Sequence, residues 1–242
     1  MNTGSAAISW DKLLQSQGFG TRKHCQQLVD CGAVSVAGVV VESYRQTIAP
    51  AGLVFAVDGE EWHYHRQLYV ALNKPPDYEC SRKTSHHPGV LTLLPEQMLE
   101  RDVQPVGRLD HDTTGLLLLS DDGAFIHAQS SPRRHVPKVY VATTFAPVTQ
   151  SLIEMLKRGV RLHDEPAPLA ATHCVALAEN ELEIVVEQGK YHQVKRMLAA
   201  AENHCVALRR SAVGGLTLNS LDLAEGKWCY LGEAELARLA NF

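Results

Sequence analysis

The run from Gly107 to Gly123 gathers side chains that can do acid–base or nucleophilic chemistry. Its sequence is GRLDHDTTGLLLLSDDG, so that Arg108 and the carboxylates Asp110 and Asp112 come shortly before four consecutive leucines. A polar loop that leads into an apolar strand places its side chains at the edge of the core, where partial burial can tune their pKa values. Composition alone also fits an ordinary turn, because Asp and Thr are common turn and cap residues.

The same run resembles the signature of the pseudouridine synthases that act on small-subunit (16S) ribosomal RNA. Further motifs of this family follow along the chain, and the segment from Asp11 to Gly38 is similar to an S4 RNA-binding domain. The further motifs are Asn73-Lys74-Pro75, Lys138-Val139-Tyr140, Gly189 to Met197 and Val213 to Leu216. The resemblance covers nearly the whole chain and implies an enzyme that isomerises a uridine in rRNA.

The resemblance implies catalytic roles for three residues. Asp110 is the essential carboxylate, acting either as a nucleophile on the ribose or uracil or as a base at the sugar. Lys195 is its expected partner, since a cation within about 4–6 Å keeps a partly buried carboxylate charged. Tyr140 is expected to stack on the target uracil and to assist proton transfer at C5. Without the family motifs, a solvated lysine and a core tyrosine would be the more common explanations.

The substrate class implies cations that contact RNA. A nucleotide must leave its stack before its base can react, and charge-assisted contacts to phosphate can offset the energy that this costs. Arg108 is expected to fill the space left by the flipped nucleotide or to hold a phosphate. The other expected contacts are Lys74, Arg133, Arg134, Lys138 and Arg196 in the catalytic domain, and Arg22 and Lys23 in the S4-like domain. The isomerisation has no redox or group-transfer step, so no cofactor is expected.

The pattern of elements that must position these residues is that of an α+β protein with two domains. In residues 1–60, a short amphipathic helix that Thr21 caps and Gly32 ends precedes short strands, as the S4-like domain requires. Residues 61–67 are expected to form a linker. Residues 68–242 form the catalytic domain, for which the resemblance implies a mixed, mostly antiparallel sheet flanked by helices. Strands are expected at 68–72, 116–119, 139–144, 181–187 and 205–213, helices at 150–158, 191–201 and 232–240, and a surface loop at 76–88.

Composition and spacing argue against several other classes. The six cysteines form no C-x-x-C pair and the histidines lack a ligating spacing, so neither a metal site nor a disulfide framework is expected. No apolar run approaches the length of a membrane span. The net charge of −4 is unusual for a nucleic-acid-binding protein, but the basic residues are clustered and can line a cleft. We expect a cytoplasmic monomer whose partner is 16S rRNA or a small-subunit assembly intermediate.

Three alternatives differ in testable ways. A large-subunit (23S) rRNA pseudouridine synthase shares much of the same motif pattern. A non-catalytic S4-containing RNA-binding or ribosome-assembly factor would keep the fold without activity, and the presence of Asp110, Tyr140 and Lys195 argues against it. A metal-dependent hydrolase that uses Asp110 and Asp112 would lose its activity to a chelator.

Overall fold

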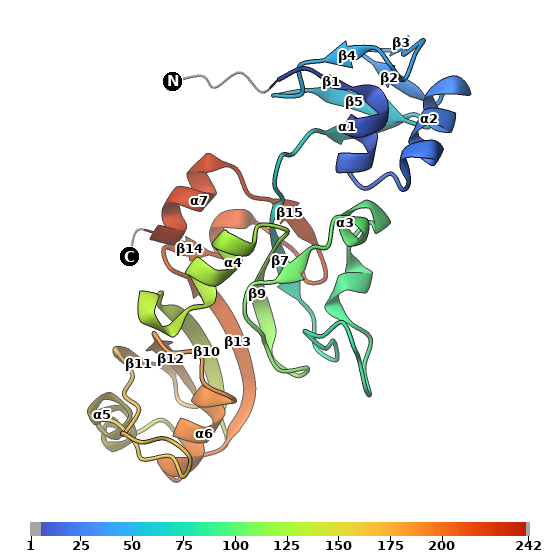
Figure 1. The fold of residues 1–242 in the computed structure, drawn as a ribbon. Helices are drawn as coiled ribbons and strands as arrows, with labels where there is room; N and C mark the ends of the chain where they lie inside the picture. The colour runs from blue at the N-terminus through green and yellow to red at the C-terminus, as the bar shows by residue number, and fades with distance from the viewer. Residues whose placement is uncertain (1–5, 241–242) are drawn as a thin grey trace. The chain divides into compact units, whose positions relative to one another are not determined.

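The computed structural model describes residues 6–240, which divide into two compact units (Figure 1). The first unit extends to residue 68 and also takes in residues 94–103, and the second contains residues 69–93 and everything from residue 104 onward. The inclusion of 94–103, with helix α3 (Glu96–Glu100), in the first unit is not evident from the sequence.

Up to residue 68, the described part of the first unit contains two helices and short strands around an aromatic core. Its strands β3, β2, β5 and β6 form an antiparallel sheet in that order, and β1 pairs with β4. Trp10, Phe19 and Phe55 are buried and meet edge to face. In chain order the elements are β1 (Ile8–Ser9), α1 (Trp10–Ser16), α2 (Arg22–Asp30), β2 (Val34–Val36), β3 (Val39–Val40), β4 (Thr47–Ile48), β5 (Val54–Val57) and β6 (Glu60–His63).

Helix α2 has the start and the buried face that the sequence predicts. The hydroxyl oxygen of Thr21 accepts a hydrogen bond from the backbone N–H of His24, and Cys25 and Val29 are buried on one side of the helix. Strand β6 pairs with β5 and ends at His63, so the sheet continues into residues 61–67, which the sequence predicts to be a linker.

The second unit contains a nine-stranded sheet with helices around it. Its elements are β7 (Tyr69–Lys74), η1 (Val90–Leu93), β8 (Gln104–Pro105), β9 (Thr114–Ser120), α4 (Gly123–Ser130), η2 (Pro132–Arg134), β10 (Lys138–Thr144), α5 (Gln150–Arg158), β11 (His173–Ala178), β12 (Glu181–Val186), α6 (Gln193–Ala200), β13 (Cys205–Val213), β14 (Leu216–Thr217), η3 (Asn219–Leu221), β15 (Trp228–Tyr230) and α7 (Glu233–Ala240).

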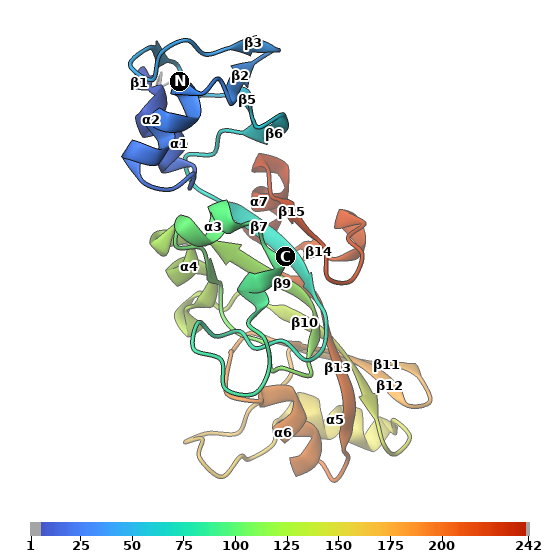
Figure 2. The ribbon, with the colours of Figure 1, turned by 90° about the vertical axis from the view of Figure 1, so that its right-hand side faces the viewer.

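The strand order of this sheet is β11-β12-β10-β13-β9-β7-β15, with β14 beside β13 and β8 beside β9. Among the strand pairs of the described residues only β9 and β13 run parallel, which confirms the predicted mixed, mostly antiparallel sheet. Figure 2 shows β13 crossing the middle of the unit between β10 and β9. The parallel pair brings the start of β9, which follows the polar loop of Asp110, next to the centre of β13.

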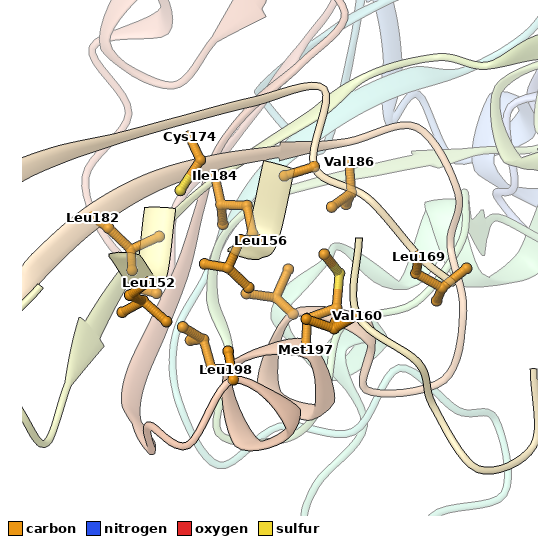
Figure 3. Close-up of a cluster of buried hydrophobic side chains, with 14 of the residues drawn as sticks. Leu152, Leu156, Val160, Leu169, Cys174, Leu182, Ile184, Val186, Met197 and Leu198 are labelled. Atoms are coloured by element: carbon orange, nitrogen blue, oxygen red, sulfur yellow. The ribbon is translucent and has the colours of Figure 1, made fainter. Parts of the chain in front are cut away.

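Two helices pack together against one half of the sheet (Figure 3). Leu152 and Leu156 of α5 meet Met197 and Leu198 of α6 in a cluster that also contains Ile184 of β12. This packing holds α6 against the sheet and fixes the direction in which its polar face points.

Helix α6 begins later than the periodicity predicts. The expected helix at 191–201 starts at Gln193, because His192 has a left-handed backbone conformation with φ of 47°. Residues 75–89 contain no helix or strand beyond an isolated bridge between Glu79 and Gly89, as expected of a loop. Between residues 6 and 240, no helix has the length and apolar character needed to cross a membrane.

Candidate active site

A buried lysine binds the backbone of the loop that carries Asp110. Lys74, at the end of β7, has no exposed surface, and its Nζ atom donates hydrogen bonds of 2.9, 2.8 and 2.9 Å to the carbonyl oxygens of Pro75, His111 and Thr113. Burial lowers the pKa of Lys74, although the nearby Cys80 and carboxylates oppose the shift. Lys74 cannot reach a phosphate, so its expected RNA contact is wrong, and it positions the backbone of the loop instead.

The C-terminal end of the same loop is fixed by a close approach of two strands. Gly115 has φ of +100°, and a Cβ atom at this position would lie 2.3 Å from the carbonyl oxygen of Arg210. The Nε atom of the buried Arg210 donates a 2.7 Å hydrogen bond to the carbonyl oxygen of Leu116. Only glycine fits at position 115, since a side chain would push β9 away from β13.

The carboxylate of Asp110 is held by two side chains from the region of α6. Nζ of Lys195 lies 3.1 Å from Oδ2 of Asp110, and Nε2 of His192 lies 3.0 Å from Oδ1. The side chain of Asp110 keeps 23% of its surface exposed. The carboxylate therefore has a partner on each oxygen and still faces the solvent, from which a substrate would approach.

Lys195 also binds the second aspartate of the loop. Its Nζ atom lies 2.6 Å from Oδ1 of Asp112. Burial acts to lower the pKa of Lys195, but hydrogen bonds from Lys195 to Asp112 and Asp110 outweigh it and raise the pKa above its usual value. Burial acts to raise the pKa of Asp112, and the hydrogen bond and charge of Lys195 bring it below its usual value instead. Lys195 is thus a stable cation that joins the helix to the loop.

His192 is a site residue for which the sequence predicts no role. Its ring stacks on that of Tyr191 at 3.8 Å between centroids, and it occupies the N-cap position of α6. The family motif contains this residue, but no local pattern predicts its left-handed backbone, which turns the imidazole toward Asp110.

Two cavities share Asp110 as a lining residue. The outer cleft has a volume of about 690 Å³, and its walls are residues 79–81, 86–87, 107–111 and 189–192. The inner recess, of about 60 Å³, lies between Asp110 and the half-buried Tyr140 of β10. Asp110 and Tyr140 therefore line the same recess, Lys195 pairs with Asp110, and the outer cleft has the size of a typical ligand site.

The predicted RNA-binding residues of the catalytic unit lie in different surroundings. Arg108 is exposed and lines both cavities, while Arg133 and Arg134 are exposed on η2 and line neither. Lys138 is buried, and burial lowers its pKa to about 8, with the charge of Arg210 acting in the same direction and that of Glu187 against it. The expected contact of Lys138 with a surface phosphate is therefore wrong, because the residue is buried, with 9% of its surface exposed.

The remaining predicted contacts include two arginines in ion pairs. Arg196 pairs with Asp164 and donates to the carbonyl oxygen of Tyr191, so its guanidinium is already engaged within the protein. In the first unit, Arg22 donates a 2.7 Å hydrogen bond to the buried Asp11 and keeps half of its side chain exposed. Lys23 is exposed beside it on α2.

A group of possible metal ligands includes two histidines of the outer cleft wall. One ligand atom from each of Asp77, His87 and His111 lies within 4.8 Å of the other two. Asp77 and His87 belong to the 76–88 loop and His111 to the loop of Asp110, so the spacing rules that argue against a metal site in the sequence could not detect the group.

The arrangement suits chemistry that needs an ionised carboxylate and a planar ligand. Lys195 and His192 contact both oxygens of Asp110, and the aromatic residue Tyr140 lines the same recess. A reaction with a detached intermediate requires such a recess to hold the base and keep water out.

The comparisons with known proteins agree with this geometry. The model of the RNA pseudouridylate synthase family matches residues 68–200. The ribosomal small subunit pseudouridine synthase A of Escherichia coli K12 is 37% identical over 94% of this chain and 97% of its own length. The protein of the same name from Vibrio cholerae is 35% identical over 95% of this chain and 98% of its own.

A solved structure supports the same assignment. A crystal structure of a pseudouridylate synthase matches 96% of this chain and 99% of its own, with a TM-score of 0.67 and 30% sequence identity. Because family model, sequence relatives and fold agree over most of the chain, this protein belongs to the RNA pseudouridylate synthase family.

Proposed function

We propose that this protein converts one uridine of 16S rRNA to pseudouridine, with Asp110 as the essential carboxylate. The observation that carries the catalytic assignment is the position of Asp110, between Lys195 and His192 at the mouth of the recess that contains Tyr140. The small-subunit substrate is supported by the relatives named ribosomal small subunit pseudouridine synthase A, which match nearly the full chain.

The reaction exchanges one bond of C1′ for another. The bond from C1′ to N1 of the base breaks, the uracil rotates, and a bond from C1′ to C5 forms, while C5 loses a proton and N1 gains one. Asp110 acts as a nucleophile or as a base, and both roles need the carboxylate in its ionised form. Lys195 favours that form through its charge, and His192 donates to the other oxygen when Nε2 carries the proton.

Tyr140 and Arg108 are placed to handle the base and the RNA strand. The ring of Tyr140 offers a face on which the uracil stacks before and after its rotation. Arg108 is exposed where the recess meets the outer cleft, so its guanidinium can hold a phosphate or replace the flipped nucleotide. Arg133 and Arg134 extend the phosphate contacts outside the cleft.

The first unit serves as the RNA-recruiting part in this proposal. Its exposed Lys23 and the partly exposed Arg22 lie in the first turn of α2, as in the S4-like domain that the sequence resembles. Residues 1–58 contain four lysines and arginines and four acidic residues, so this part of the chain has no excess of positive charge. This balance favours docking on a large ribonucleoprotein over tight binding of a short oligonucleotide. We place the reaction in the cytoplasm and take the active form to be a monomer.

The test compares three substrates and three proteins. Wild type, Asp110→Asn and Asp222→Asn are incubated with 16S rRNA, with small-subunit particles and with 23S rRNA, and pseudouridine is mapped by carbodiimide modification and primer extension. Asp222 is a matched control, because it is exposed, lines neither cavity and has a left-handed backbone that asparagine tolerates.

The proposal expects one marked uridine in 16S rRNA or in the particle, with wild type and Asp222→Asn, and none with Asp110→Asn. If only 23S rRNA were marked, the assignment of 16S rRNA as the substrate would be wrong, but the assignment of the protein as a pseudouridine synthase would stand. RNA binding without marking of any substrate would favour the non-catalytic assembly factor. Equal activity of Asp110→Asn would overturn the assignment of the catalytic carboxylate.

A further inference from the structure

Two histidines and one carboxylate lie close together at the loop that carries Asp110, which is called the catalytic loop below. The proposed reaction assigns no role to these three side chains. His87 and His111 stack with ring centroids 4.5 Å apart and planes at 12°, and Asp77 lies next to them. Each of the three offers one ligand atom, and these atoms lie within 4.8 Å of one another. Asp77 and His111 are exposed and His87 is half-buried.

The backbone around these residues is already tied together. The N–H of Asp77 donates a 2.8 Å hydrogen bond to the carbonyl oxygen of His111, which also accepts from Lys74. The carboxylate of Glu79 accepts hydrogen bonds from the N–H groups of His86 and His87 at 2.9 and 3.1 Å. The positions of the three ligand residues are thus set by contacts other than those of their own side chains.

We propose that Asp77, His87 and His111 bind a divalent transition-metal ion of the Zn²⁺ class. Two imidazole nitrogens and one carboxylate form a common ligand set for such ions, with water in the fourth tetrahedral position. Ligand atoms about 2.0–2.1 Å from a tetrahedral ion lie roughly 3.3 Å apart. The side chains reach that spacing by rotation about their χ angles, for which the exposed Asp77 and His111 have room.

The ion would join two segments that form the outer cleft. His87 belongs to the 76–88 loop, while His111 stands between Asp110 and Asp112 in the catalytic loop. Both histidines line the 690 Å³ cleft. A bound ion therefore clamps the 76–88 loop onto the catalytic loop and adds positive charge to a wall that faces the RNA in the proposed function. The metal-binding step itself does not depend on that function.

Metal binding is tested first by titration. Protein without an affinity tag is stripped with a chelator and titrated with Zn²⁺ by calorimetry and with Co²⁺ by visible absorption. Wild type is expected to bind one equivalent with the absorption of a four-coordinate site. Asp77→Asn, His87→Ala and His111→Ala are each expected to weaken binding at least about 10-fold, since even changes outside the ligand shell cost that much.

His86→Ala is the matched control for these variants. His86 is exposed, adjoins His87 and lies in the same cleft wall, but it is not one of the three clustered residues. It should keep the affinity and the cobalt spectrum of wild type. Circular dichroism and thermal unfolding of each variant without metal check that the fold is retained.

A second measurement tests the clamp. Lys83 is an exposed trypsin site in the 76–88 loop, so Zn²⁺ should slow cleavage after Lys83 in wild type and in His86→Ala, and leave it unchanged in His111→Ala. Absence of stoichiometric binding by wild type, or equal affinity in His111→Ala and His86→Ala, would overturn the site. Binding without protection of Lys83 would overturn the clamp.

Discussion

The ammonium group of Lys195 lies 3.1 Å from the carboxylate of Asp110, so that α6 and the loop before β9 meet as an ion pair whose carboxylate lines a recess. Family resemblance predicts this pair. The structure adds that the same ammonium also binds Asp112, at 2.6 Å, and that His192 occupies the other oxygen of Asp110.

Replacing Lys195 by methionine should lower the single-turnover rate about 100-fold or more, because removal of one preorganised electrostatic partner typically costs this much. Lys195→Arg keeps the charge and should retain more activity. Lys157→Met is the control, since Lys157 is exposed on α5 and lines neither cavity. Equal rates for Lys195→Met and Lys157→Met would remove Lys195 from the site.

The direction of the pKa of Lys195 also predicts a pH response. The folded-state pKa of Lys195 is raised above the pKa of the unfolded chain, which is about 10.4. The ion pairs of Lys195 therefore stabilise the protein fully at pH values below the unfolded pKa, and this stabilisation is lost only as the pH rises through the folded pKa. Any loss of activity below about pH 10 should therefore come from another group. If the alkaline limb of the rate profile were to vanish in Lys195→Arg, this expectation would be wrong.

Replacing Lys74 by methionine should stop turnover without changing the salt dependence of RNA binding. The three carbonyl oxygens that Lys74 holds would lose their partner, at a cost of about 2–4 kcal/mol in the free energy of unfolding. Arg108→Ala should instead lower the slope of log affinity against log salt by about 1. Urea unfolding and binding at several salt concentrations distinguish the two, and a reduced slope in Lys74→Met would contradict the buried position.

A methyl group at position 115 should separate the parallel strands β9 and β13. Gly115→Ala places a Cβ atom against the carbonyl oxygen of Arg210 and strains the backbone, which should destabilise the protein by about 3 kcal/mol and disturb the loop of Asp110. Gly123→Ala is the control, because nothing lies within 4 Å of its added Cβ. Urea midpoints and single-turnover rates measure both effects, and similar midpoints for the two variants would refute the close approach.

The buried Lys138 should make stability increase with pH above neutrality. Burial lowers its folded pKa to about 8, so between about pH 8 and 10 the folded protein has released a proton that the unfolded chain still holds. The free energy of unfolding therefore rises over that range in wild type. Lys138→Met should be more stable at pH 7 by about 1–2 kcal/mol and should lack this rise.

Urea unfolding of wild type and Lys138→Met at pH 7 and at about pH 9.5 tests this prediction. A rise of the same size in both proteins would assign the titration to another group, and a less stable Lys138→Met at pH 7 would show that the buried ammonium stabilises the fold.

Local patterns in the sequence suffice for much of the framework. The helix over Gln150–Arg158 has the predicted bounds, and β9 and β13 form where apolar runs predict strands. These elements follow from hydrophobic periodicity and caps, which are properties of neighbouring residues. Helix α4 was not predicted, because its apolar residues are not gathered on one face, and only its N-cap Asp122 gives a local signal.

Apart from the Asp110–Lys195 pair, which the family resemblance predicts, the tertiary structure decided which side chains meet. Sequence motifs indicate functional roles for Lys74, Lys138 and Lys195. In the structure, Lys74 is buried against the backbone of the catalytic loop, Lys138 is buried in the sheet, and Lys195 pairs with Asp110. The cluster of Asp77, His87 and His111 likewise exists only because two loops are hydrogen-bonded together. The physical reason is that element formation depends on local spacing, whereas burial, strand pairing and the meeting of distant loops depend on packing across the whole unit.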